Sequence, residues 1–139
     1  MTITFRPYML TLVSLLAAGC ATVPPDVIGS GTQLEIRQMQ TREYDTLDKQ
    51  MTMRSVISTL QDLGFLIDKA DLSLGTITAT RLHQYEMRMT ITVREKGESR
   101  VAVRVSARIG EKNVANPKTY QDFFVALDKA MFLTLHKVD

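Results

Sequence analysis

The chain has 139 residues, one cysteine and a formal net charge of +2, which suits a single small domain. The near balance of acidic and basic side chains supplies no bulk field for nucleic acid, so no nucleic-acid partner is predicted. A single cysteine excludes an internal disulfide. The domain must therefore be stabilised by the burial of apolar side chains.

The first twenty residues are organised like a secretory signal. Arg6 precedes an apolar run over 8–18, which is too short for a bilayer, since a spanning helix needs about 20 apolar residues. Small residues and then Cys20 follow this run, as at a signal cleavage site. The alternative, an ordinary thiol in a packed core helix, is disfavoured because Pro24 and Pro25 come soon after Cys20.

The stretch Leu15-Leu16-Ala17-Ala18-Gly19-Cys20 resembles the lipobox of bacterial lipoproteins. The resemblance implies that residues 1–19 are a signal peptide and that Cys20 carries diacylglycerol and palmitate after cleavage. Because Ala21 rather than Asp follows Cys20, it also implies sorting to the periplasmic face of the outer membrane. Residues 20–33 are then the lipidated amino terminus and a flexible linker, since 21–32 contain prolines and glycines without apolar periodicity.

Residues 34–139 are expected to form one periplasmic domain. Alternation of Leu34 and Ile36 with charged residues predicts a first strand over 34–44. A helix over 47–63 follows from apolar residues at helical spacing, with Asp45 or Thr46 as its cap and Gly64 as its end. A short strand over 65–67, a turn over 68–75 and a strand over 76–81 come next.

Two amphipathic strands form the clearest pattern in the chain. Odd-numbered residues of 85–93 and 101–109 are apolar, whereas the even-numbered ones are mostly polar or charged, which predicts one buried face. Odd residues share that face in both strands only if paired residue numbers have an even sum. A three-residue loop over 96–98 meets this condition by pairing Glu95 with Ser99. The same register sets Glu86 opposite Arg108 as an ion pair.

Asn116 and Pro117 predict the start of a last helix, with a side-chain cap and then a proline in the first turn. Over 117–136 this helix would span about 30 Å, long enough to cross a small sheet. One face carries Tyr120, Phe123, Phe124, Leu127, Met131 and Thr134. The other side carries Val125 and Phe132, interpreted either as a partner surface or as additional core.

The predicted order is β-α-β-β-β-β-α, which indicates an α+β fold: an antiparallel sheet with two helices on one face. The stretches Leu60-Gln61-Asp62-Leu63-Gly64-Phe65 and Asp71-Leu72-Ser73-Leu74-Gly75-Thr76-Ile77-Thr78-Ala79 resemble the helix-grip domains of a lipoprotein component of the outer-membrane barrel-assembly machine. The resemblance implies a single helix-grip-like domain on a small outer-membrane lipoprotein.

The sequence predicts no catalytic constellation. His83 lies in a predicted turn and His136 near the end of the last helix, and neither has metal-ligand spacing with another His, Cys or carboxylate. We therefore expect no metal, no other cofactor and no enzymatic activity. The polar run Tyr44-Asp45-Thr46 is interpreted as a strand end and helix cap rather than a site.

A basic stripe lies on the outer face of the two amphipathic strands. It consists of Arg88, Arg94, Arg100 and Arg104, none of which has an acid directly opposite in the predicted register. These arginines are interpreted either as an ordinary solvated sheet face or as a contact for lipid-headgroup phosphates or a polyanion, because the guanidinium fork matches phosphate geometry.

Together these features predict an outer-membrane lipoprotein whose domain is a non-catalytic accessory or scaffold module. Its expected partners are the membrane, through the anchor, and an integral membrane protein, a transport or secretion assembly, or a second copy of the chain. The alternative is a module that binds a lipid or another hydrophobic ligand in a cavity beneath Met87, Met89, Phe123 and Phe124.

The anchor generates a direct prediction. Cys20→Ser removes the thiol that would be acylated, so the variant should accumulate as an unprocessed precursor without lipid label. Metabolic labelling with a radioactive fatty acid, read beside the size of the chain, measures both effects. Normal maturation of this variant would refute the anchor.

Overall fold

The computed structural model describes residues 33–136. The expected signal peptide over 1–19, the Cys20 lipidation site and the linker up to residue 32 lie outside the described residues. The elements in order are α1 (Gln33–Met39), β1 (Thr41–Tyr44), α2 (Lys49–Asp62), β2 (Leu66–Asp71), β3 (Thr76–Leu82), β4 (Glu86–Lys96), β5 (Arg100–Ile109), β6 (Lys112–Asn113) and α3 (Pro117–Leu135).

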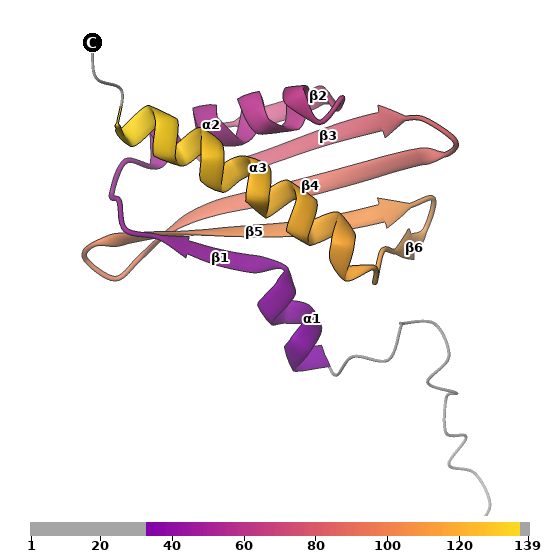
Figure 1. Ribbon diagram of the computed structural model, residues 1–139, viewed down its shortest axis with the longest axis horizontal. Coiled ribbons are helices and arrows are strands. Elements are labelled where there is room, and N and C mark those ends of the chain that lie inside the picture. The colour runs from indigo at the N-terminus through magenta and orange to yellow at the C-terminus, as the bar shows by residue number, and fades with distance from the viewer. Residues whose placement is uncertain (1–32, 137–139) are drawn as a thin grey trace, which may run out of the picture.

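The predicted α+β class is confirmed, since α2 and α3 cover one face of an antiparallel six-stranded sheet (Figure 1). The strand order is β1-β5-β4-β3-β2, with β6 paired to β5. The predicted element order lacked α1 and β6, and otherwise holds.

The two edges of the sheet differ in how their strands are paired. Beside β5, β1 pairs with residues 101–104, the Gln40 carbonyl accepts from the Val105 N–H at 2.8 Å, and β6 pairs with Arg108 and Ile109. At the opposite edge, the register of β2 shifts between Ile67 and Lys69. This irregularity is a β-bulge, which bends a strand and breaks its regular ladder.

The first predicted strand is wrong over residues 34–39, which form helix α1. All seven residues of α1 except Ile36 are good helix formers, and Glu35 and Arg37 lie at the ends of the helix that favour their charges. Leu34, whose alternation with Ile36 suggested a strand, is exposed. Only Thr41–Tyr44 are in a strand.

Helix α2 begins at Lys49 because Asp48, rather than Asp45 or Thr46, caps it. The Asp48 carboxylate accepts from the Met51 N–H at 2.7 Å. Gly64 follows the helix at φ +80°, as predicted. The guanidinium of Arg81 donates to the Leu63 carbonyl at 3.1 Å, which is one of the carbonyl groups left without a partner at the end of a helix.

Strand β2 extends to Asp71, so the predicted turn over 68–75 is too long. The observed turn follows Asp71, whose carboxylate accepts from the Leu74 N–H at 2.9 Å and the Ser73 hydroxyl at 2.7 Å. These bonds, the Leu74 N–H first, lower the pKa of Asp71. Asp71 and Ser73 thus make the local bonds that their residue types predict.

The hairpin of β4 and β5 buries its odd-numbered face as predicted, but in a different register. Lys96 pairs with Arg100 and Arg88 with Arg108, so the three-residue loop is 97–99 and the predicted pair of Glu86 with Arg108 is wrong. The loop opens with Gly97 at φ +64°, a left-handed conformation that glycine adopts without strain. Tyr85, which the pattern placed on the buried face, is exposed.

Helix α3 crosses the sheet diagonally and closes the core (Figure 1). The Asn116 side chain accepts from the Lys118 N–H at 3.0 Å, with Pro117 in the first turn, as predicted. The buried face of α3 consists of Tyr120, Phe123, Phe124, Leu127 and Met131. Thr134, the last residue of the predicted face, is instead exposed and donates to the carbonyl of Ala130.

Gly75 and Gly97 provide a matched test of the turn geometry. Both have positive φ, but a Cβ at Gly75 would lie 2.2 Å from the Val93 carbonyl oxygen, whereas one at Gly97 would meet nothing within 4 Å. Gly97→Ala should lower the free energy of unfolding by about 1 kcal/mol. Gly75→Ala should lower it by about 3 kcal/mol or more, because backbone must move. Urea unfolding measures both, and equal losses would contradict the close approach at Gly75.

Candidate functional site

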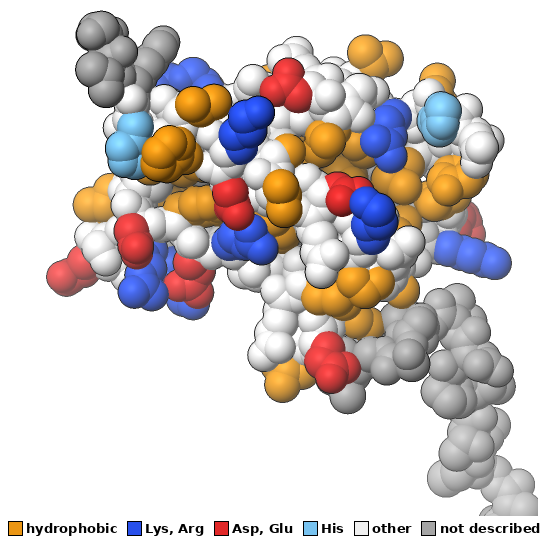
Figure 2. All heavy atoms as spheres, viewed as in Figure 1, with side chains coloured by type: hydrophobic (Ala, Val, Ile, Leu, Met, Phe, Trp, Pro, Cys, Tyr) orange, Lys and Arg blue, Asp and Glu red, His pale blue; other side chains and the backbone are white. Residues whose placement is uncertain are grey.

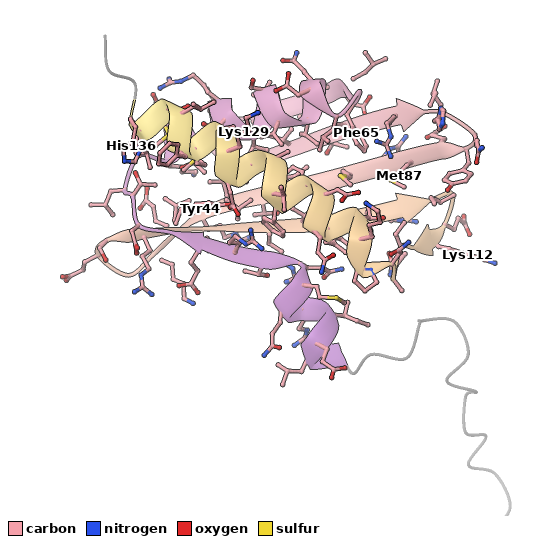
Figure 3. The ribbon with its side chains drawn as sticks, in the orientation of Figure 1. Tyr44, Phe65, Met87, Lys112, Lys129 and His136 are labelled. Atoms are coloured by element: carbon pink, nitrogen blue, oxygen red, sulfur yellow. The ribbon has the colours of Figure 1, made fainter. Side chains whose placement is uncertain are left out.

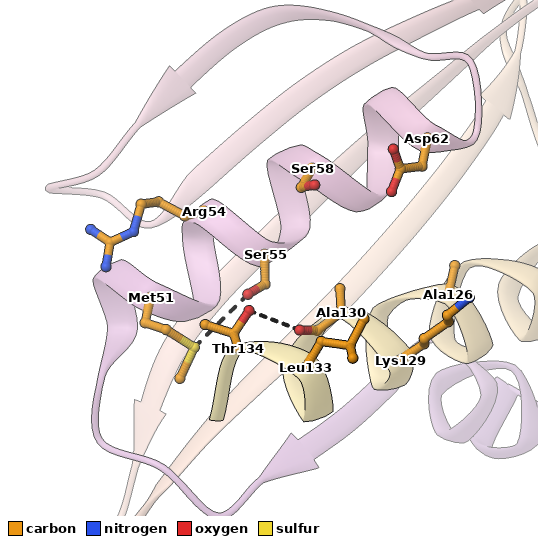
Figure 4. Close-up of a pocket in the computed structure, with 10 residues that line it drawn as sticks. All are labelled: Met51, Arg54, Ser55, Ser58, Asp62, Ala126, Lys129, Ala130, Leu133 and Thr134. Atoms are coloured by element: carbon orange, nitrogen blue, oxygen red, sulfur yellow. Dashed lines mark hydrogen bonds between the residues drawn. The ribbon is translucent and has the colours of Figure 1, made fainter. Parts of the chain in front are cut away.

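A groove of about 690 Å³ lies between α2 and α3 (Figure 4). Its floor includes Ser55, whose hydroxyl lies 3.8 Å from the Met51 sulfur, and Ala130 on the facing helix. Charged side chains stand along it, so the groove is apolar in part and charged in part. The complete lining is Met51, Arg54, Ser55, Ser58, Asp62, Ala126, Lys129, Ala130, Leu133 and Thr134.

The outer side of α3 carries large hydrophobic side chains beside this groove. Val125 is 66% exposed and Phe132 is 58% exposed, so the interpretation of these two residues as additional core is wrong. Leu133 and Leu135 are also more than half exposed. Figure 2 shows hydrophobic side chains on this helix-bearing face, set among charged ones. Val125, Phe132 and Leu133 are called the α3 patch below; Leu135 is two residues from Leu133 and therefore lies on another side of the helix.

The sequence placed a ligand cavity beneath Met87, Met89, Phe123 and Phe124, and the structure fills that region. All four side chains are buried in the core, and Phe123 and Phe124 pack edge to face with ring centroids 5.3 Å apart. Among the hollows found over residues 33–136, the larger ones lie between helices or at the surface.

The four predicted arginines lie on the face of the sheet opposite α2 and α3, but they do not behave alike. Arg100 bonds Asp45 at 3.1 Å and Glu43 at 3.3 Å, and Lys96 also bonds Glu43. These two cations hold the pKa of the Glu43 carboxyl below its usual range, with the Lys96 hydrogen bond as the largest cause. Arg88 bonds its own-strand neighbour Glu86 at 3.3 Å. Arg94 and Arg104 make no ion pair with any residue in 33–136.

Asp128 of α3 binds strand β1 through two side chains. Its carboxylate accepts from the Tyr44 hydroxyl at 2.8 Å and pairs with Arg42, whose guanidinium also lies 4.8 Å from the centroid of the Phe124 ring. Figure 3 shows Tyr44 on the side of the sheet that α3 covers. Tyr44 is thus a structural contact between helix and sheet.

The two histidines of the described chain lie at the ends of different elements. His83 lies in the bend between β3 and β4, while His136 follows α3, stacks on Phe132 with ring centroids 4.3 Å apart and contacts the Phe132 carbonyl. No group of three or more His, Cys, Asp or Glu within 33–136 is placed to hold a metal ion. None of the helices in this range combines the length and the apolarity needed to cross a membrane.

A scan against protein-family models finds none that matches the chain, and a search of curated proteins finds no match either. The resemblances to bacterial lipoproteins and to the barrel-assembly lipoprotein therefore stay predictions.

The contact between Tyr44 and Asp128 generates a pH prediction. Burial, together with the hydrogen bond to the Asp128 carboxylate, raises the pKa of Tyr44 well above its usual value. Because its pKa is raised in the fold, Tyr44 keeps its proton at a pH where the unfolded chain, with a pKa of about 10, has lost it. The free energy of unfolding therefore has its full tyrosine contribution below about pH 10 and declines as pH rises further. Tyr44→Phe should therefore lower the free energy of unfolding by about 1 kcal/mol at pH 7 and make its decline above about pH 10 shallower.

Urea unfolding of the wild type and of Tyr44→Phe at a series of pH values measures this effect. Parallel pH profiles for the two proteins would contradict the assigned role of the tyrosine.

Proposed function

We propose that the chain is a lipoprotein anchored through Cys20 to the periplasmic face of the outer membrane, and that its domain is a non-catalytic accessory or scaffold module of an envelope assembly. The partner is an integral membrane protein of a transport or secretion assembly, or a second copy of the chain.

The observation that carries the docking role is the α3 patch. Isolated exposed hydrophobic residues are ordinary on a protein surface, but a group of them on one helix is typical of a contact surface. Val125 and Phe132 are seven residues apart, which puts them on the same side of the helix, and Leu133 lines the adjoining groove. An apolar partner segment can lie along such a ridge and groove.

The lipobox stretch supports the anchor. Neither core packing nor helix capping accounts for the exposure of Val125 and Phe132. Their exposure therefore favours a partner surface over a purely structural role.

Site-specific photocrosslinking of the intact lipoprotein tests the proposal. A photoreactive residue at Val125 or Phe132 should form a discrete adduct in intact cells, because both side chains point outward. The same residue at Glu98, in the exposed hairpin loop, serves as the matched control and should not. Recovery of only the monomer from all three positions would refute the docking role.

A pair of charge variants separates docking from folding. Val125→Asp and Phe132→Asp should abolish the adduct formed at the other position, while changing the free energy of unfolding by no more than about 0.5 kcal/mol, as exposed substitutions usually do. An adduct that persists in both variants would show that the α3 patch is not the contact.

A further inference from the structure

Besides the ion-paired Arg100, the face of the sheet opposite α2 and α3 carries four arginines, of which only Arg88 forms an ion pair with a described residue. Arg88, Arg94, Arg104 and Arg108 are exposed and project from the even-numbered side of β4 and β5. This set is called the arginine face below. Arg108 was missed as a candidate because the predicted register gave it Glu86 as a partner.

The pairing of the strands places like charges together on this face. Arg88 lies directly opposite Arg108. Arg104 lies opposite Thr92, so it is diagonal to Arg94, which is two residues further along β4 on the same face of the sheet. Like charges directly opposite each other destabilise a sheet. Among the residues in 33–136, only Arg88 of the four has an ion-pair partner, Glu86. An anion bound from outside would relieve this repulsion.

The arginines border shallow hollows rather than a smooth surface. Arg94 and Arg104, with Thr41 and Thr92, line one of about 350 Å³. Arg88 and Arg108 line a smaller one of about 90 Å³ together with Glu86, whose carboxylate already pairs with Arg88, so the hollow at Arg94 and Arg104 is the better fit to a phosphate. Guanidinium forks and hydroxyl donors around a hollow are suited to phosphate oxygens.

Two large apolar side chains share the arginine face. Leu66 is 72% exposed and Leu82 is 73% exposed. Leu66 pairs with Thr80, which pairs with Arg88, so the leucine and the arginine lie on the same side of the sheet. Leu82 lies on that side too, opposite Glu86. Cations combined with protruding leucines favour a lipid surface, whereas single-stranded nucleic acid is bound with stacking aromatic side chains.

We propose that the arginine face docks on an anionic phospholipid surface, with the arginines on headgroup phosphates and Leu66 and Leu82 in the interfacial layer. The helix layer, including the α3 patch, then points away from that bilayer. The inference rests on the proposed lipid anchor for bringing the domain to the surface, since a short tether raises the effective concentration of the face there.

Protection of a single thiol tests the orientation of the acylated full-length protein in vesicles. Cys20 is the only native cysteine, and in the proposed lipoprotein its sulfur is blocked as a thioether to diacylglycerol, so an introduced cysteine is the sole reactive thiol. Ser106→Cys lies between Arg104 and Arg108 on the arginine face, and Gln61→Cys lies on the exposed side of α2, outside the groove, as the matched control. The rate of reaction with an impermeant maleimide is compared in vesicles of phosphatidylcholine and in vesicles of equal parts phosphatidylcholine and phosphatidylglycerol.

We expect Ser106→Cys to react more slowly in the phosphatidylglycerol vesicles, and Gln61→Cys to react equally in both. The ratio of rates in the two vesicles removes any difference in intrinsic thiol reactivity. NaCl at about 1 M, where the Debye length falls to about 3 Å, should abolish the protection. Equal rates for Ser106→Cys in the two vesicles would overturn the proposal.

Charge-matched triple variants identify the residues responsible. Arg94→Gln, Arg104→Gln and Arg108→Gln together should remove the protection of Ser106→Cys, at roughly five-fold in the docked-to-free ratio per arginine. Arg54→Gln, Lys118→Gln and Lys129→Gln remove the same charge from the helix layer and should leave it intact. Protection that survives the first triple variant, or an equal protection by a soluble oligonucleotide, would overturn the proposal.

Flotation separates this inference from the anchor. The acylated protein should float with phosphatidylcholine vesicles through its lipid alone. If it does not float, the anchor is refuted. Flotation with the phosphatidylglycerol vesicles then still tests the arginine face, and absence of binding to these vesicles would refute its proposed docking on anionic lipid.

Discussion

The burial of the odd-numbered side of β4 and β5 beneath α3 is the constraint on which the rest of the structure depends. Val93, Val103 and their odd-numbered neighbours are buried against Phe123 and Leu127. Because side chains alternate strictly along a strand, burying one side sends every even-numbered residue to the other. A single packing event therefore produces both surfaces discussed here: the outer side of α3 and the arginine face.

The sequence predicts which residues of the hairpin are buried but not its exact register. The even-sum condition is met by several pairings that differ by two, and the choice depends on the turn, where Gly97 takes up a left-handed conformation that composition alone does not specify. The misassigned α1 has a similar cause. Alternation over Leu34 and Ile36 is too short to outweigh the helix propensity of the whole segment. Helical spacing identified α2 and α3 because their apolar stripes extend over several turns, and the Asn116 cap located the start of α3, whereas the predicted cap of α2 was wrong.

A candidate surface could be predicted from the sequence where all of its residues lie on one helix or strand. Val125 and Phe132 lie off the buried stripe of α3, and this is visible from helical spacing alone. The α2 side of the groove depends on how two helices pack, which spacing does not reveal. Arg108 was obscured by the register, and the shared side of Leu66 and Leu82 appears only once β2, β3 and β4 are aligned.

The bulged outer strand β2 has a consequence for the anchoring that we propose. Its ladder is interrupted between Ile67 and Lys69, and charged side chains occupy that stretch, while the strand at the other edge, β1, has only four residues. Short, irregular or charged edge strands disfavour pairing with a strand of another molecule. Molecules confined to two dimensions collide far more often than molecules free in bulk. The edge strands β1 and β2 therefore disfavour the strand pairing between neighbouring molecules that crowding at a membrane would promote.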